Sequence, residues 1–308
     1  MKYSFALLPF VAAILVAVGC SKNQGGGASL DEVFRVGISP DVQTLVSIKM
    51  DQLKASEIYR SHQQLLNLPQ FNAIAERAGL DPRRDIASLC LAWDGKHLLL
   101  MAQGAFSVAT LEKKIMADGA QRVPYKNFTL LTRGADSVSF PGHGLAVASS
   151  TPAVQSALDL LSARTGAIPA ELQERLAEVP SDAQIWVVSR GGLPAANYPL
   201  RSDLDSALSN IATLVTGTSF GLRFDSGSHL QARILCKSPE GAQRVNDAMR
   251  GLIGFARLST NDNELDLLRV WDSVSVTKEE ATVRVQADLP ADLSNKMIDK
   301  LAALLKTH

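Results

Sequence analysis

The feature that most constrains the fold of this chain is a set of four short matches between its first and second parts. They occur in the same order in both parts and are separated by about 130 to 140 residues, which predicts two related domains rather than a solenoid of short repeats. The matched pairs are DVQTLVSIK (41–49) with DAQIWVVSR (182–190), WDGKHLLLMAQ (93–103) with FDSGSHLQARIL (224–235), DSVSF (136–140) with DSVSV (272–276), and TPAVQSALDLL (151–161) with LPADLSNKMIDKL (289–301).

Each part is predicted to run strand, helix, hairpin, helix, strands, helix. Asp94-Gly95 and the stretch 225–228 are hairpin signals between apolar runs. Helical spacing of apolar residues follows each hairpin and also closes each part. The apolar positions are Val108, Leu111 and Ile115; Ala242, Val245, Met249 and Leu252; Val154, Leu158 and Leu161; and Leu293, Met297, Leu301 and Leu305. The sequence therefore predicts the α+β class, with two related halves, each an antiparallel sheet backed by helices.

The predicted halves span 30–164 and 182–308. Between them, 165–181 is expected to be a linker with one short polar helix between Pro169 and Pro180. Cys20 is followed by a polar, glycine-rich stretch, so residues 20–29 are expected to form a flexible tether.

The N-terminus has the features of a secretory signal peptide over residues 1–19. Lys2 is followed by a short apolar run, which ends in Ala17-Val18-Gly19-Cys20. This junction resembles the lipobox of bacterial lipoproteins, in which the cysteine becomes the lipid-bearing first residue. An unmodified signal-peptide cysteine is the alternative interpretation. Ser21 follows Cys20, and the resemblance then implies the outer membrane, with the chain on its periplasmic face.

A second resemblance covers mainly residues 41 to 190. The segments MDQL, SEIYRS, AERAGLDPRRDIASL and WDGKHLLLMAQGAF resemble a set of uncharacterised bacterial envelope proteins. Those proteins carry Gly-[Leu/Ile]-Asp-Pro-x-x-Asp-[Ile/Val] before a first hairpin, which corresponds here to Gly79–Ile86. The resemblance implies an α+β fold with two repeats and brings no activity with it.

The composition argues against several classes of function. Basic and acidic residues are equal in number, 31 each, so the chain lacks the positive charge of a nucleic-acid-binding protein. Aromatic residues make up only 6%, which gives few platforms for stacking on bases or sugars. Cys90 and Cys236 both lie in apolar runs; they are either two buried thiols or a disulfide.

GTSFG at 217–221 matches the G-x-S-x-G pattern of serine hydrolases, which makes Ser219 a candidate nucleophile. In that fold the serine lies on a sharp turn from a strand into a helix. Here helical spacing over 204–215 comes before the motif and strand-like alternation follows it. We therefore expect Gly217 to end a helix as its C′ residue and Ser219 to begin a strand, with no catalytic role.

Three further patterns suggest chemistry that their context does not support. SVTK at 275–278 matches S-x-x-K but stands in a predicted strand and turn. NDNELD at 261–266 clusters carboxylates that could bind calcium, but it lacks the glycine and the distal glutamate of an EF-hand loop. His97 and His229 occupy equivalent hairpin positions, which favours a shared structural role over a metal pair.

The sequence thus predicts a non-catalytic lipoprotein that faces the periplasm and acts by protein or ligand contacts. Its expected partners are the membrane, through a lipid on Cys20, and an envelope protein. No nucleic acid, cofactor, metal site or catalytic residue is expected. Two alternatives remain open: a carrier of a small or lipidic ligand bound between the halves, and a serine hydrolase that uses Ser219.

Overall fold

The computed structural model describes residues 27–62, 80–191 and 211–306, with side chains up to residue 300. Cys20, the signal peptide and most of the tether therefore lie outside the described residues. Helices and a large antiparallel sheet are both present, which confirms the α+β class. Among the described residues, no helix is both long enough and apolar enough to cross a membrane.

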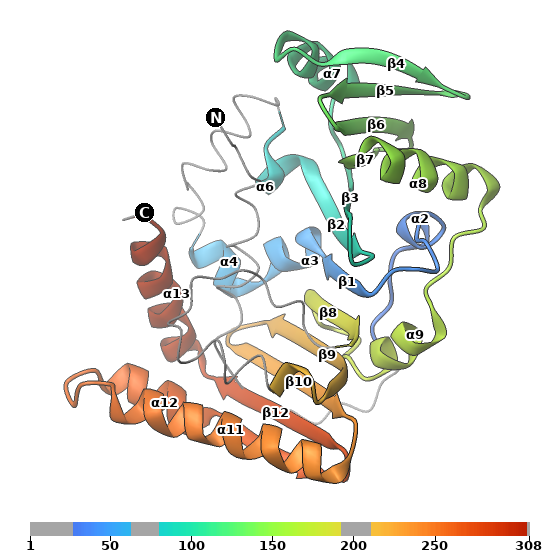
Figure 1. Cartoon of the computed structure of the whole chain (residues 1–308). Coiled ribbons are helices and arrows are strands. Elements are labelled where there is room, and N and C mark those ends of the chain that lie inside the picture. The colour runs from blue at the N-terminus through green and yellow to red at the C-terminus, as the bar shows by residue number, and fades with distance from the viewer. Residues whose placement is uncertain (1–26, 63–79, 192–210, 307–308) are drawn as a thin grey trace.

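Twelve strands form one continuous sheet, and every pair of neighbours is antiparallel (Figure 1). Their order across the sheet is β11-β12-β10-β9-β8-β1-β2-β3-β7-β6-β5-β4. The strands are β1 Thr44–Ile48, β2 Ile86–Trp93, β3 Leu98–Gly104, β4 Gln121–Tyr125, β5 Phe128–Arg133, β6 Asp136–Gly142, β7 Leu145–Ser150, β8 Ile185–Arg190, β9 Val215–Phe224, β10 Ser228–Cys236, β11 Ser275–Glu279 and β12 Thr282–Leu289.

The two parts of the chain meet where β1 pairs with β8, with Val46 opposite Val187 at the centre of the pairing. Both strands are almost entirely buried, as expected for central strands covered on both faces. Instead of one separate sheet in each half, the strands of both parts therefore share a single sheet. A ligand between the halves would have to lie above or below this hydrogen-bonded junction.

Ten helices have described bounds, and several of them confirm the predicted apolar spacing. Helix α7 follows the β2–β3 hairpin and α11 follows the β9–β10 hairpin; α8 and α13 follow β7 and β12. The helices are α2 Glu32–Arg35, α3 Met50–Ala55, α4 Glu57–Ser61, α6 Pro82–Asp85, α7 Val108–Ala117, α8 Thr151–Ala163, α9 Ala170–Ala177, α11 Pro239–Leu258, α12 Leu265–Ser273 and α13 Ala291–Lys306.

The hydrophobic core is divided along the sheet. The largest cluster joins α8 and α9 to the strands around the β1–β8 junction, and Trp186 of β8 is fully buried in it. A second cluster joins α11 to β10, β11 and β12. Figure 1 shows α11 and α12 running across this end of the sheet, with β4–β7, α7 and α8 at the opposite end. The predicted helix in 165–181 is α9, and it packs on β8 and β9 through Leu172 and Leu176.

The described part of the motif Gly79–Ile86 forms α6 and its connection to β2. Asp81 caps the helix by accepting a hydrogen bond from the Arg83 backbone N–H, and Pro82 stands at the first helical position. Asp85 accepts hydrogen bonds from Arg84 Nε at 2.7 Å and from the Asp81 backbone N–H at 2.8 Å. The Arg84 hydrogen bond lowers the pKa of Asp85, although burial opposes it. Both aspartates of the motif therefore serve the local fold.

The expectation for Gly217 is wrong. β9 begins at Val215, and Gly217 is a strand residue paired with Arg190 of β8 and Leu235 of β10. Its backbone is not in the positive-φ region, so it does not end a helix. Hydrogen-bonded pairing with β8 and β10 on both sides outweighs the helical spacing of the apolar residues before it. The stretch 204–210 of that spacing lies outside the described residues. Close packing favours a small residue there, because a Cβ would lie 3.2 Å from the Ser189 carbonyl oxygen.

Candidate functional site

Ser219 lies in the middle of β9 and not on a turn. Its side chain is buried, with 3% of the residue exposed. Its Oγ donates to Glu178 Oε2 at 3.0 Å, and Arg175 Nη1 donates to Glu178 Oε1 at 2.8 Å. The described partner of Ser219 is thus a carboxylate paired with an arginine, and not the imidazole of a serine-hydrolase triad. The arrangement fixes the β9 backbone against the end of α9 and does not resemble a nucleophile elbow.

We expect Ser219 to resist a fluorophosphonate probe, since the probe needs an accessible, activated hydroxyl. Ser219→Ala should lower the free energy of unfolding by about 1 to 2 kcal/mol, because it removes a buried hydrogen bond to a charged group. Mass spectrometry measures the labelling, and urea denaturation measures the free energy of unfolding. The matched control is Ser226→Ala, which changes a serine in an exposed hairpin. Stoichiometric label at Ser219, lost in Ser219→Ala, would restore the hydrolase alternative.

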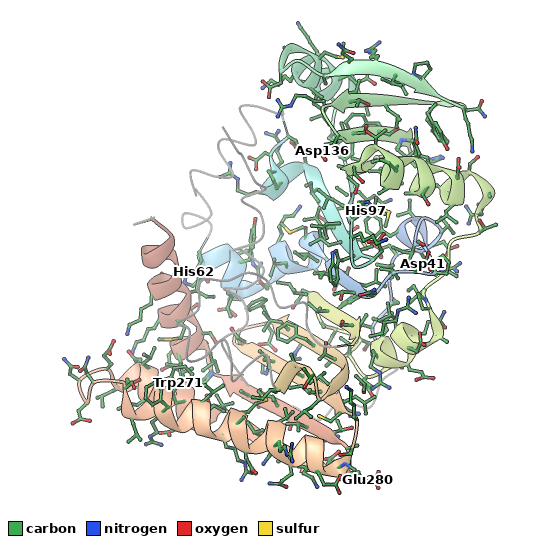
Figure 2. The ribbon with its side chains drawn as sticks, in the orientation of Figure 1. Asp41, His62, His97, Asp136, Trp271 and Glu280 are labelled. Atoms are coloured by element: carbon green, nitrogen blue, oxygen red, sulfur yellow. The ribbon has the colours of Figure 1, made fainter. Side chains whose placement is uncertain are left out.

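The two hairpin histidines have the same kind of partner, an aspartate of their own turn. His97 Nδ1 lies 3.2 Å from Asp94 Oδ2, and His229 Nε2 lies 3.1 Å from Asp225 Oδ1 (His97 is labelled in Figure 2). Burial raises the pKa of each aspartate, but hydrogen bonds from turn backbone N–H groups and from the histidine outweigh it, so both pKa values are lowered. His229 also contacts Asp288 of β12. These contacts support the predicted structural role in turn closure.

The acidic stretch 261–266 is occupied by ion pairs. Glu264 Oε1 lies 3.3 Å from Lys300 Nζ, and Asp266 Oδ1 lies 2.9 Å from Lys296 Nζ. Both lysines belong to α13, so this stretch ties α12 to the last helix. In the described ranges, no group of three histidine, cysteine or acidic residues is placed to hold a metal ion. The S-x-x-K stretch lies in the edge strand β11, where Ser275 Oγ donates to the Gln286 carbonyl.

Cys90 and Cys236 are both buried free thiols and are not joined in a disulfide. Burial raises the pKa of the Cys90 thiol far above its usual range, and it also raises that of Cys236. A protonated, buried thiol is a poor nucleophile. These two cysteines therefore act as small core residues.

Sequence reasoning did not identify two arginines that lie side by side on β10 and β12. Arg233 is the register partner of Arg284, and Thr277 of β11 continues the row. Buried and half-buried residues alternate along β12, and the buried Val283 and Val285 pack with α11, so Arg284 between them lies on the opposite face. Arg284 Nη2 donates to Glu279 Oε2 at 2.8 Å. Among the described residues, Arg233 has no hydrogen-bond or ion-pair partner. We call this side of β10–β12–β11 the polar face.

A group of apolar side chains lies exposed where α11 ends and α12 begins. Leu258 is 87% exposed, Leu265 67% and Phe255 65%, and Leu252 lies one to two turns before them on α11. Between the helices stand Asn261, Asp262 and Asn263. We call Leu252, Phe255, Leu258 and Leu265 together the apolar end. The spacing on α11 predicted a buried helical face, but the sequence alone did not show that this face extends past the edge of the sheet.

Comparison with known proteins adds information on the fold alone. No protein-family model matches the chain, and no curated protein matches it. Three crystal forms of TP0453 are similar in structure over nearly their whole length. Form III has a TM-score of 0.50 at 10% identity and covers 89% of this chain and 99% of that one. Forms I and IV each have a TM-score of 0.46 at 12% identity, and cover 89% and 90% of this chain and 98% and 97% of theirs.

Proposed function

We propose that this chain is a non-catalytic lipoprotein, anchored by a lipid on Cys20 to the outer membrane on its periplasmic face, and that it acts by binding an envelope protein. The Ala17-Val18-Gly19-Cys20 junction supports the anchor. The burial of Ser219 in the middle of a strand, with a partner carboxylate that is itself paired with Arg175, supports a binding role over hydrolysis.

We also propose that residues 30–164 and 182–308 are related halves. The sheet order supports this duplication, because it reads outward from the β1–β8 junction in the same way in both directions. β1, β2, β3, β7 and β6 on one side correspond to β8, β9, β10, β12 and β11 on the other. The helices after β3 and β10, and those after β7 and β12, correspond as well. The hairpin β4–β5 has no strand counterpart in the second half, where α12 occupies that place in the chain.

The apolar end is the single observation that carries the binding role. Three large apolar side chains, each about two-thirds exposed or more, lie in the last turn of α11 and at the first residue of α12, and these two helices contact each other. Exposed apolar groups rimmed by polar residues are typical of protein interaction sites. Glu264 is paired with Lys300, but Asp262 in the connecting stretch adds negative charge beside the apolar residues, which disfavours an anionic lipid surface and favours a protein partner. A lipid anchor would keep this surface close to other envelope proteins.

The test is photocrosslinking in cells that make the full-length chain. A benzophenone residue in place of Leu258 should give one protein adduct of defined mass, whereas the same residue in place of the exposed Lys113 of α7 should give none. Phe255→Ser should reduce the adduct at least fivefold, because it removes a neighbouring apolar contact. Cys20→Ser should abolish palmitate incorporation and also the adduct.

Two results would contradict this proposal. A palmitate label that persists in Cys20→Ser would remove the anchor. Crosslinks from position 258 that reach only lipid, or that appear equally from position 113, would remove the protein-binding role of the apolar end.

A further inference from the structure

The polar face holds two positive charges where antiparallel pairing does not favour them. Facing residues in such a pair have Cβ atoms about 4.5 to 5.5 Å apart, and like charges directly opposite each other are destabilising. Arg233 and Arg284 occupy such a pair of positions. The Nε atoms of both are buried and have no hydrogen-bond partner among the described residues. Of the two, Arg284 is paired with the carboxylate of Glu279, and no carboxylate of the described residues pairs with Arg233.

The carboxylate of Glu178, which lies beside β9, already has two other partners. Ser219 of β9 is the register partner of Arg233 on its other side, and its Oγ donates to Glu178. The other oxygen of Glu178 accepts a hydrogen bond from Arg175. The row Ser219–Arg233–Arg284–Thr277 therefore crosses the sheet with the Arg233 guanidinium at its centre, and nothing in 27–62, 80–191 or 211–306 neutralises that guanidinium. Arg284 keeps 26% of its side chain exposed and Thr277 is exposed, so solvent reaches this row.

We propose that Arg233 and Arg284 together bind a phosphate group on the polar face. Two adjacent guanidinium groups present several N–H donors to a tetrahedral oxyanion, and arginine matches phosphate oxygens in a bidentate manner. The anion would neutralise Arg233 and accept further hydrogen bonds from Arg284, which is already paired with Glu279. Thr277 adds a neutral hydroxyl at the exposed end of the row. Inorganic phosphate and a phosphate ester, such as a lipid headgroup, share this chemistry.

The test is calorimetric titration of the full-length chain, in detergent and at constant ionic strength, with inorganic phosphate and in parallel with glycerol phosphate. Arg233→Gln and Arg284→Gln should each weaken binding about tenfold or more, since each removes a charge-assisted pair of hydrogen bonds. The matched control is Arg244→Gln, an exposed arginine of α11 away from the polar face, which should stay within about twofold of wild type. Tighter binding of the ester would identify a phosphorylated headgroup as the ligand class, and tighter binding of inorganic phosphate would identify the free anion.

Thermal denaturation separates binding from folding. Without ligand, Arg233→Gln should melt at or above the wild-type temperature, because it relieves the like-charge repulsion. Phosphate should raise the melting temperature of wild type and Arg244→Gln but not that of Arg233→Gln. If wild type binds neither anion at millimolar concentration, or if Arg233→Gln binds as wild type does, the phosphate site is wrong. The site is separate from the apolar end, so the crosslink from position 258 should survive in Arg233→Gln.

Discussion

Gly104→Ala is expected to lower the free energy of unfolding by about 3 kcal/mol or more, because the added methyl group would overlap backbone atoms. A Cβ at this position would lie 1.9 Å from the Asp85 carbonyl oxygen and 2.9 Å from the Ile86 Cα. Both are backbone atoms at the start of β2, so no side-chain rotation relieves the overlap. The Asp85 carbonyl also accepts a hydrogen bond from the Ala105 N–H at 2.9 Å, which holds the two segments together.

The other side of Gly104 is equally restricted. Its N–H donates to the Gly144 carbonyl at 2.9 Å, and a Cβ on Gly144 would lie 2.3 Å from the Gly104 oxygen. The end of β3 is thus held between α6 and the β6–β7 hairpin. Urea denaturation followed by circular dichroism measures the effect.

The matched control is Gly251→Ala on the exposed side of α11. A Cβ there meets no atom within 4 Å, and alanine favours the helix by about 0.5 to 1 kcal/mol over glycine, so this variant should be as stable as wild type or more stable. A Gly104→Ala variant within about 1 kcal/mol of wild type would mean that α6 and β3 do not approach each other as described.

The strands and hairpins followed closely from sequence because their signals are local. Asp94-Gly95 closes β2 and β3, and the alternation of apolar residues in β12 gives its buried face directly. The helices after each hairpin were equally clear from apolar spacing. These features depend on residues a few positions apart, which is the range in which periodicity and turn chemistry act.

What could not be predicted depends on which distant strands become neighbours. Gly217 was placed at the end of a helix because the sequence does not show that β8 and β10 flank it on both sides. For the same reason the union of both parts through β1 and β8 was not expected. Arg233 and Arg284 are about fifty residues apart and become a pair only through the register of β10 on β12. Nothing in the local sequence of either strand identifies the other arginine as its neighbour.

Trp186→Ala is expected to cost about 3 to 5 kcal/mol of unfolding free energy, since it removes the largest fully buried side chain of the core. Trp186 lies in β8 opposite Ser47 of β1, next to the junction of the two parts. The cavity left by the alanine variant would therefore weaken the packing of α9 against the central strands. Urea denaturation measures the loss, and tryptophan fluorescence reports whether the remaining core stays intact.

Trp186→Phe provides the matched comparison at the same site and should cost about 1.5 kcal/mol or less. The indole Nε1 is buried and has no hydrogen-bond partner among the described residues, and an unsatisfied buried donor carries a penalty of about 1 to 3 kcal/mol. Phenylalanine removes that donor while keeping most of the apolar volume, so the regained penalty offsets part of the lost packing. If the phenylalanine variant is as unstable as the alanine variant, the indole N–H must have a polar partner in the folded protein.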